Sequence, residues 1–116
     1  MTDFTIAQLK DELTKLASAE QGTEDPNLEE LIEELEYNKN EIYTIFEDQL
    51  VKYVDSFGGE GQGDEYWVVF SVGQGDTKRL FNTPGWYASY EGGELQVDDI
   101  FEVVAKEVVK IEYVKV

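Results

Sequence analysis

The spacing of apolar residues changes once along this chain, at the glycine-rich segment GGEGQG of residues 58–63. Before it, apolar residues recur every three or four positions, as in amphipathic helices. After it, they alternate with polar residues, as in half-buried strands. We therefore expect an α+β fold in which N-terminal helices pack on a C-terminal antiparallel meander sheet of four or five strands. The 116 residues are predicted to form a single domain, with a helical part over 1–57, a flexible connector over 58–63 and a β part over 64–116.

The first helix is expected to start at Ile6 and to stop at Gly22. Thr5 and Gln8 have the spacing of a capping box, and glycine is a common residue just past a helix end. Phe4 and Leu9 are placed to form a hydrophobic staple across this start.

A second helix is expected to start at Asp25-Pro26, with aspartate as the N-cap and proline in the first turn. Its apolar stripe over 28–35 resumes over 42–57, after polar residues of poor helix propensity at 38–40. One long helix and two shorter ones both fit this pattern. We favour a helix from about residue 26 to about residue 56, kinked near 38–40.

In the second half, residues 66–72 carry large apolar groups on both faces of an expected strand, which predicts a central position in the sheet. A short strand over 78–82, a turn over 83–85 and a third strand over 86–91 should follow. Residues 97–105 could form a short helix or a strand, because their apolar residues match neither period cleanly. The alternation over 109–113 predicts a final half-buried strand.

The composition excludes several classes of function. With 26 acidic and 9 basic residues, the net charge of −17 disfavours direct binding to nucleic acid or to an anionic membrane. Cysteine and histidine are both missing, which removes thiolate chemistry, the common zinc ligands and the commonest general base. The chain has neither a phosphate-binding loop motif nor a calcium-loop motif. We therefore predict no catalytic residue, no metal, no cofactor and no enzymatic activity.

Carboxylates of the second helix lie opposite its apolar stripe and should form a solvated acidic face: Glu29, Glu30, Glu33, Glu34 and Glu36. Carboxylates three or four residues apart on a helix are roughly 5–6 Å from one another, a spacing that could imitate phosphates. Helix propensity and solubility explain the same pattern, and we favour that simpler explanation.

Aromatic residues gather in the expected strands: Tyr66, Trp67, Phe70, Trp86, Tyr87 and Tyr90. Such rings can pack in the core or anchor a partner protein, and core packing is the more common use. Because side chains alternate along a strand, at least one ring of the pair Trp86 and Tyr87 should point away from the helices.

The stretches YWVVFSVG, RLF, GWYASYEGGEL and FEVVAKEVVKIEY resemble small acidic proteins encoded by tailed bacteriophages, which carry a similar G-x-Y-x-S-Y segment between two strands. The matching residues here are Gly85, Tyr87, Ser89 and Tyr90, and the resemblance covers residues 64–114. It implies a phage or phage-like genome, the cytoplasm of a bacterial host and a non-enzymatic accessory role. The helical half has no counterpart in this resemblance.

The leading hypothesis is a protein-interaction module for an unidentified protein with a basic surface, without direct contact to nucleic acid or membrane. Two alternatives are an acidic DNA mimic that inhibits a nucleic-acid-binding protein, and a minor structural protein of a phage particle. The oligomeric state stays open. The candidate binding residues are Trp67, Trp86, Tyr87, Tyr90, Glu29, Glu30, Glu33 and Glu34.

Overall fold

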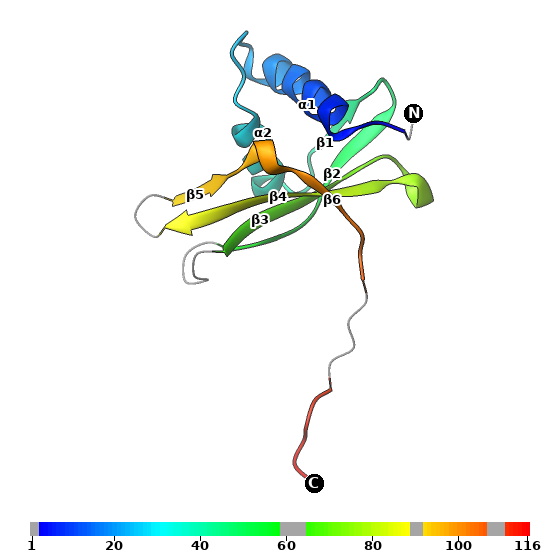
Figure 1. Cartoon of the computed structure of the whole chain (residues 1–116), viewed down its shortest axis with the longest axis vertical. Helices are drawn as coiled ribbons and strands as arrows, with labels where there is room; N and C mark the ends of the chain where they lie inside the picture. The colour runs from blue at the N-terminus through cyan, green and yellow to red at the C-terminus, as the bar shows by residue number, and fades with distance from the viewer. Residues whose placement is uncertain (1–2, 59–64, 89–91, 107–110) are drawn as a thin grey trace.

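The computed structural model describes residues 3–58, 65–88, 92–106 and 111–116, and it confirms the α+β class. Two helices precede the strands of an antiparallel sheet (Figure 1). The helices are α1 (Ile6–Gln21) and α2 (Leu28–Tyr37). The strands are β1 (Ile42–Ile45), β2 (Gln49–Phe57), β3 (Glu65–Val72), β4 (Arg79–Ala88), β5 (Gly92–Leu95) and β6 (Phe101–Val103).

In the described residues the sheet has six strands, and five of them follow meander order from β1 to β5. Four strands, β3 to β6, fall within residues 64–116, as predicted, and β1 and β2 are additional. The sixth, β6, pairs with β4 along residues 80–82, beside the stretch of β4 that pairs with β5. Strand β3 lies between β2 and β4, which confirms its predicted central position.

Both ends of α1 are as predicted. Thr5 accepts a hydrogen bond from the backbone N–H of Gln8, and the Gln8 side chain accepts one from the backbone N–H of Thr5. Gly22 ends the helix in the left-handed conformation, with φ of 64°. Phe4 and Leu9, the predicted staple pair, are both in the buried core.

The prediction of a helix over 26–56 is wrong. Helix α2 is capped by Asn27 instead of Asp25 and ends at Tyr37, and residues 42–57 form the β1–β2 hairpin. A tight reversal joins the two strands, with positive φ at Phe46 and Glu47. The apolar residues over 42–57 satisfy a helical and an alternating period together, and β-branched and aromatic residues are numerous there, so packing on the sheet decides for strands.

The N-terminal part over 1–57 is therefore not all helical, because β1 and β2 belong to it. The glycine-rich segment 58–63 joins two adjacent antiparallel strands, β2 and β3, and does not connect a helical half to a sheet. Residues 59–64 lie outside the described part of the chain.

The predicted turn over 83–85 is also wrong, because β4 runs through it without interruption. Proline is tolerated because its missing N–H leaves no carbonyl there without a donor. The Pro84 carbonyl accepts a hydrogen bond from the N–H of Gln96 at 2.7 Å. In a regular ladder the Gln96 carbonyl would accept from the N–H of residue 84, which proline lacks. The Gln96 carbonyl accepts instead from the N–H of Asp99 at 3.0 Å. Gly85 is required by close packing, since a Cβ there would lie 2.1 Å from the Glu94 carbonyl oxygen.

The two alternatives for residues 97–105 both fail in part. A short 3₁₀ turn, η2 (Val97–Asp99), is followed by the three-residue strand β6. The predicted final strand over 109–113 falls partly on residues 107–110, which lie outside the described residues. Its remainder is wrong, because residues 111–116 have no regular secondary structure and both Ile111 and Tyr113 are exposed.

Both helices lie on one side of the sheet (Figure 1). We call the sheet face beneath them the core face and the opposite one the outer face. The even-numbered residues of β3 share the core face, where they are buried against the helices. The buried core consists of Phe4, Leu9, Leu13, Ala17, Leu31, Ile32, Leu35, Tyr43, Ile45, Val51, Tyr66, Val68, Phe70, Val72, Phe81, Leu95 and Ile100.

Candidate interaction surface

The outer face of the sheet carries many apolar side chains, although α1 and α2 pack on the other side. The alternation of side chains and the pairing registers assign its residues. Each of these apolar side chains is half-buried or exposed. They are Ile42, Leu50, Phe57, Trp67, Val69, Leu80, Pro84, Trp86, Phe101 and Val103. Polar residues are interspersed among them: Thr44, Lys52, Asp55, Glu65, Ser71, Asn82 and Glu94.

Three of the aromatic rings, those of Phe57, Trp67 and Trp86, are at one end of the outer face. Phe57 and Trp67 are directly opposite each other on β2 and β3, and their rings stack with centroids 6.1 Å apart. The Trp67 indole N–H donates to Glu65 Oε1 at 3.2 Å, which fixes the orientation of the ring. The structure thus presents a preformed aromatic surface there.

Trp86 lies between two carboxylate residues. Its cross-strand neighbours are Glu65 on β3 and Glu94 on β5, and 37% of its surface is exposed. An indole face flanked by carboxylates suits a lysine or arginine side chain, because ring and carboxylates both attract a cation. This part of the outer face therefore combines an aromatic ring with negative charge and is suited to a basic partner.

The predicted aromatic residues separate into different places. Trp67 and Trp86 are on the outer face, whereas Tyr87 packs against the core and makes an edge contact with the Tyr66 ring, with centroids 6.5 Å apart. The expectation that one ring of the pair Trp86 and Tyr87 points away from the helices is met by Trp86. Tyr90 lies outside the described residues.

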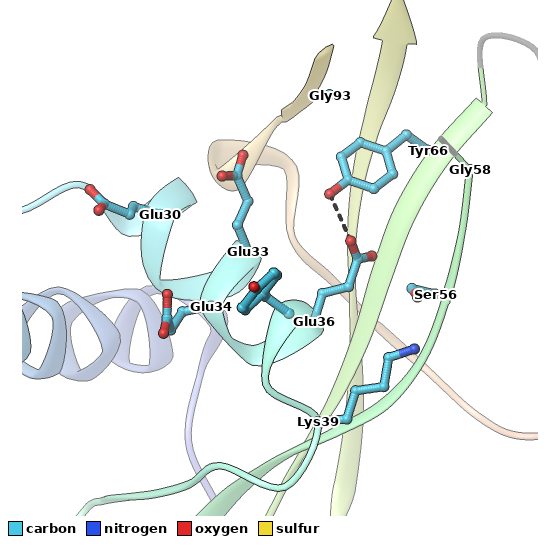
Figure 2. A pocket seen from close by; sticks show the side chains of 10 residues that line it. Glu30, Glu33, Glu34, Glu36, Lys39, Ser56, Gly58, Tyr66 and Gly93 are labelled. Carbon is cyan, nitrogen blue, oxygen red and sulfur yellow. Dashed lines mark hydrogen bonds between the residues drawn. The ribbon is translucent and has the colours of Figure 1, made fainter. Parts of the chain in front are cut away.

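The predicted solvated face of α2 is wrong for Glu29 and Glu36. Glu29 Oε2 accepts from the backbone N–H of Leu95 at 2.7 Å, at the end of β5. Glu36 Oε1 accepts from the Tyr66 hydroxyl at 3.2 Å, and Figure 2 shows the two side chains pointing toward each other. Both carboxylates thereby attach α2 to the sheet. Glu30 and Glu34 are exposed as predicted.

An open cleft of about 800 Å³ lies between α2 and the sheet (Figure 2). Partial burial, together with Glu29, Glu30 and Glu36, raises the pKa of the Glu33 carboxyl above its ordinary value. The cleft thus concentrates negative charge beside the helix. Its lining includes Glu30, Glu33, Glu34, Glu36, Tyr37, Lys39, Ser56, Gly58, Tyr66 and Gly93.

Sequence reasoning missed most residues of the outer face. Phe57 was assigned to a helix, and Pro84 to a turn. Phe101 and Val103 carried a signal, since their alternation with Glu102 is that of a strand. The register that brings them beside Leu80 on β4 is not visible in the sequence.

In the part of the chain that the structure describes, no group of three or more Asp, Glu, His or Cys residues is arranged to hold a metal ion. None of the helices described is long and apolar enough to cross a membrane. Comparison with protein-family models, curated proteins and solved structures found no match to this chain.

Proposed function

We propose that the protein is a protein-interaction module and that the outer face of its sheet is the binding surface. The observation that carries this proposal is the apolar face that α1 and α2 leave uncovered. Phe57, Trp67 and Pro84 are cross-strand neighbours on this face, and exposed apolar side chains that adjoin one another commonly mark an interaction site. Tryptophan is enriched among the residues that contribute most to binding, which makes Trp67 and Trp86 the expected anchors.

The partner is proposed to have a basic surface. Glu65 and Glu94 flank Trp86, and the net charge of −17 favours rapid encounter with a cationic protein at low salt. The resemblance to acidic proteins of tailed bacteriophages suggests a non-enzymatic accessory role in the cytoplasm of a bacterial host.

The test compares proteins retained from a bacterial lysate at low salt. The outer-face variant Phe57→Ser/Trp86→Ser should lose bound proteins that the wild type retains. The helix variant Glu30→Gln/Glu34→Gln removes two exposed charges and should retain the same proteins at a reduced association rate. Circular dichroism and thermal melting establish that each variant is folded. An outer-face variant that is folded and has unchanged partners contradicts the proposal.

The structure gives less support to a DNA mimic. Such an inhibitor needs carboxylates arrayed in rows toward solvent, whereas Glu29 and Glu36 are directed to the sheet. A minor structural protein of a particle is the second candidate function. The observation in its favour is the exposure of large apolar side chains after β6, such as Val104 and Tyr113, because assembly would bury them.

A further inference from the structure

We propose that the C-terminal segment, residues 104–116, of one copy binds across the outer face of a second copy. The inference rests on the proposed function, because it uses the same surface. It names a second copy of this chain as the partner, and the basic part of that copy is its lysine-containing segment 104–116. Three independent observations support it: the exposure of the segment, its charge and the path of the chain after β6.

The described apolar residues of this segment are almost fully exposed. The least exposed of them, Ile111, is 78% exposed, and Tyr113 is 93% exposed. The segment has no glycine or proline and is rich in β-branched residues, which favour extended structure. The segment therefore has the composition of a strand, and its described apolar side chains are not covered by any other part of the described chain. The residues concerned are Val104, Ile111, Tyr113, Val114 and Val116.

The charge of the segment is opposite to that of the remaining chain. Residues 104–116 contain three lysines and two glutamates, for a net charge of +1. The other residues contain six basic and 24 acidic side chains, for a net charge of −18. A segment of this kind is attracted to the rest of a second copy, although two whole copies repel each other.

The path of the chain disfavours binding to the segment's own sheet. Between Ile100 and Val116 there is no glycine, proline, asparagine or aspartate, the residues that favour the tight turn needed to fold back over β6. After β6 the chain leaves the sheet on the side away from the helices (Figure 1). Thirteen extended residues span about 43 Å, which exceeds the roughly 20 Å across five adjacent strands, so the segment can cross the sheet of another copy.

The contact that we propose is chemically matched. Phe101 and Val103 already belong to the outer face, so a copy that donates the segment also brings its own outer face close to its partner. Ile111 and Tyr113 would cover the rings of the partner copy. Lysines of the segment, including Lys115, would meet the carboxylates beside Trp86. Exchange in both directions would give a closed pair of copies.

The experiment measures mass by light scattering for full-length chains over a range of concentrations. The wild type should be a dimer. The segment variant Ile111→Ser/Tyr113→Ser should be a monomer, and so should the face variant Phe57→Ser/Trp86→Ser. The control Glu112→Ser lies between the two altered segment positions, leaves the apolar side chains intact and should remain a dimer.

A mixture of the two variants gives the sharpest result. One variant retains an intact face and the other an intact segment, so the mixture should form a heterodimer that neither forms alone. A monomeric wild type, a segment variant that still associates, or a mixture that stays monomeric would overturn the inference. The segment variant alone is decisive if the face variant does not fold, because its altered residues are exposed.

Failure of this inference is distinguishable from failure of the proposed function. A monomeric wild type whose face variant loses lysate proteins overturns only the second-copy partner. A folded face variant that retains the same lysate proteins as the wild type and has the same mass by light scattering overturns the inference and the proposed function together.

Discussion

The hydroxyl of Tyr66, at the start of β3, donates a hydrogen bond to the Glu36 carboxylate near the end of α2, with an oxygen–oxygen distance of 3.2 Å. The tyrosine is buried, and burial together with the negative charge of Glu36 raises the pKa of its hydroxyl well above the ordinary value. The group therefore remains a donor throughout the neutral range. This bond and the one between Glu29 and Leu95 attach α2 to the sheet through carboxylates of a strongly acidic helix.

Replacing Tyr66 by phenylalanine should destabilise the fold by about 1 kcal/mol, because Glu36 loses a donor while the ring stays in place. The melting temperature should fall by about 4 °C. Tyr87→Phe is the matched control, since the Tyr87 hydroxyl makes no hydrogen bond with the described residues and its loss should change stability by less than about 0.5 kcal/mol. Equal losses in the two variants would contradict a role for the bond.

Glu29→Ala should destabilise the protein by roughly 1–2 kcal/mol, because the backbone N–H of Leu95 would lose its acceptor in a partly buried position. Glu30→Ala is the control on the same helix, since it removes the same charge from an exposed side chain. Its free energy of unfolding should change little or rise slightly, because one repulsive charge is lost. Urea unfolding gives the free energy of unfolding of both variants. A Glu30→Ala variant less stable than Glu29→Ala would contradict the role given to the bond between Glu29 and Leu95.

The parts of the fold predicted correctly depend on local signals. The α1 cap needs only Thr5 and Gln8, and its end needs only Gly22, because these residues act on the backbone next to them. The strand over 66–72 was recognised since its alternation is long and uninterrupted. Each of these features is decided within a few residues of the chain.

The parts predicted wrongly depend on distant partners. Residues 42–57 fit two periods, and only pairing with β3 selects the strand. Pro84 reads as a turn residue until one knows that Asp99 already satisfies the carbonyl of Gln96. The outer face joins Phe57 to residues as far along the chain as Phe101. The register between paired strands is a property of the assembled sheet, so it cannot be predicted from a local sequence pattern.

Gly85→Ala should be the most damaging of the single substitutions considered. A Cβ at this position would lie 2.1 Å from the Glu94 carbonyl oxygen, and a backbone atom held in the sheet has little freedom to move. We expect a loss of more than about 2 kcal/mol, in the range of overpacked sites. Gly22→Ala, where a Cβ meets open space and only the positive φ is unfavourable, should cost about 1 kcal/mol. Thermal melting should therefore give a lower melting temperature for Gly85→Ala than for Gly22→Ala.

The carboxyl of Glu33 makes stability depend on pH. Its pKa in the folded state is raised above the unfolded value, so its contribution to stability is complete below the unfolded pKa and is lost as the pH rises through the folded pKa. Glu33→Gln should therefore be more stable than the wild type at neutral pH, and the difference should shrink on acidification through the folded pKa. Glu34→Gln is the exposed control and should show a smaller gain. Melting curves across this pH range measure both, and a gain independent of pH contradicts the assignment to Glu33.

Added sodium chloride should raise the melting temperature. Ion pairs in the described part of the chain join Lys10 to Asp98, Lys15 to Glu12 and Arg79 to Glu102. Exposed pairs of this kind typically contribute ~1 kcal/mol or less each, whereas the net charge of −17 repels throughout the folded state. Salt screens the attraction within ion pairs and the repulsion among like charges, with a Debye length of about 10 Å at 0.1 M. Because the total repulsion is larger than the total attraction, screening should stabilise the folded state. Potassium chloride should have the same effect at equal ionic strength, since screening does not depend on the cation. A melting temperature that falls with either salt would mean that paired charges outweigh the repulsive ones.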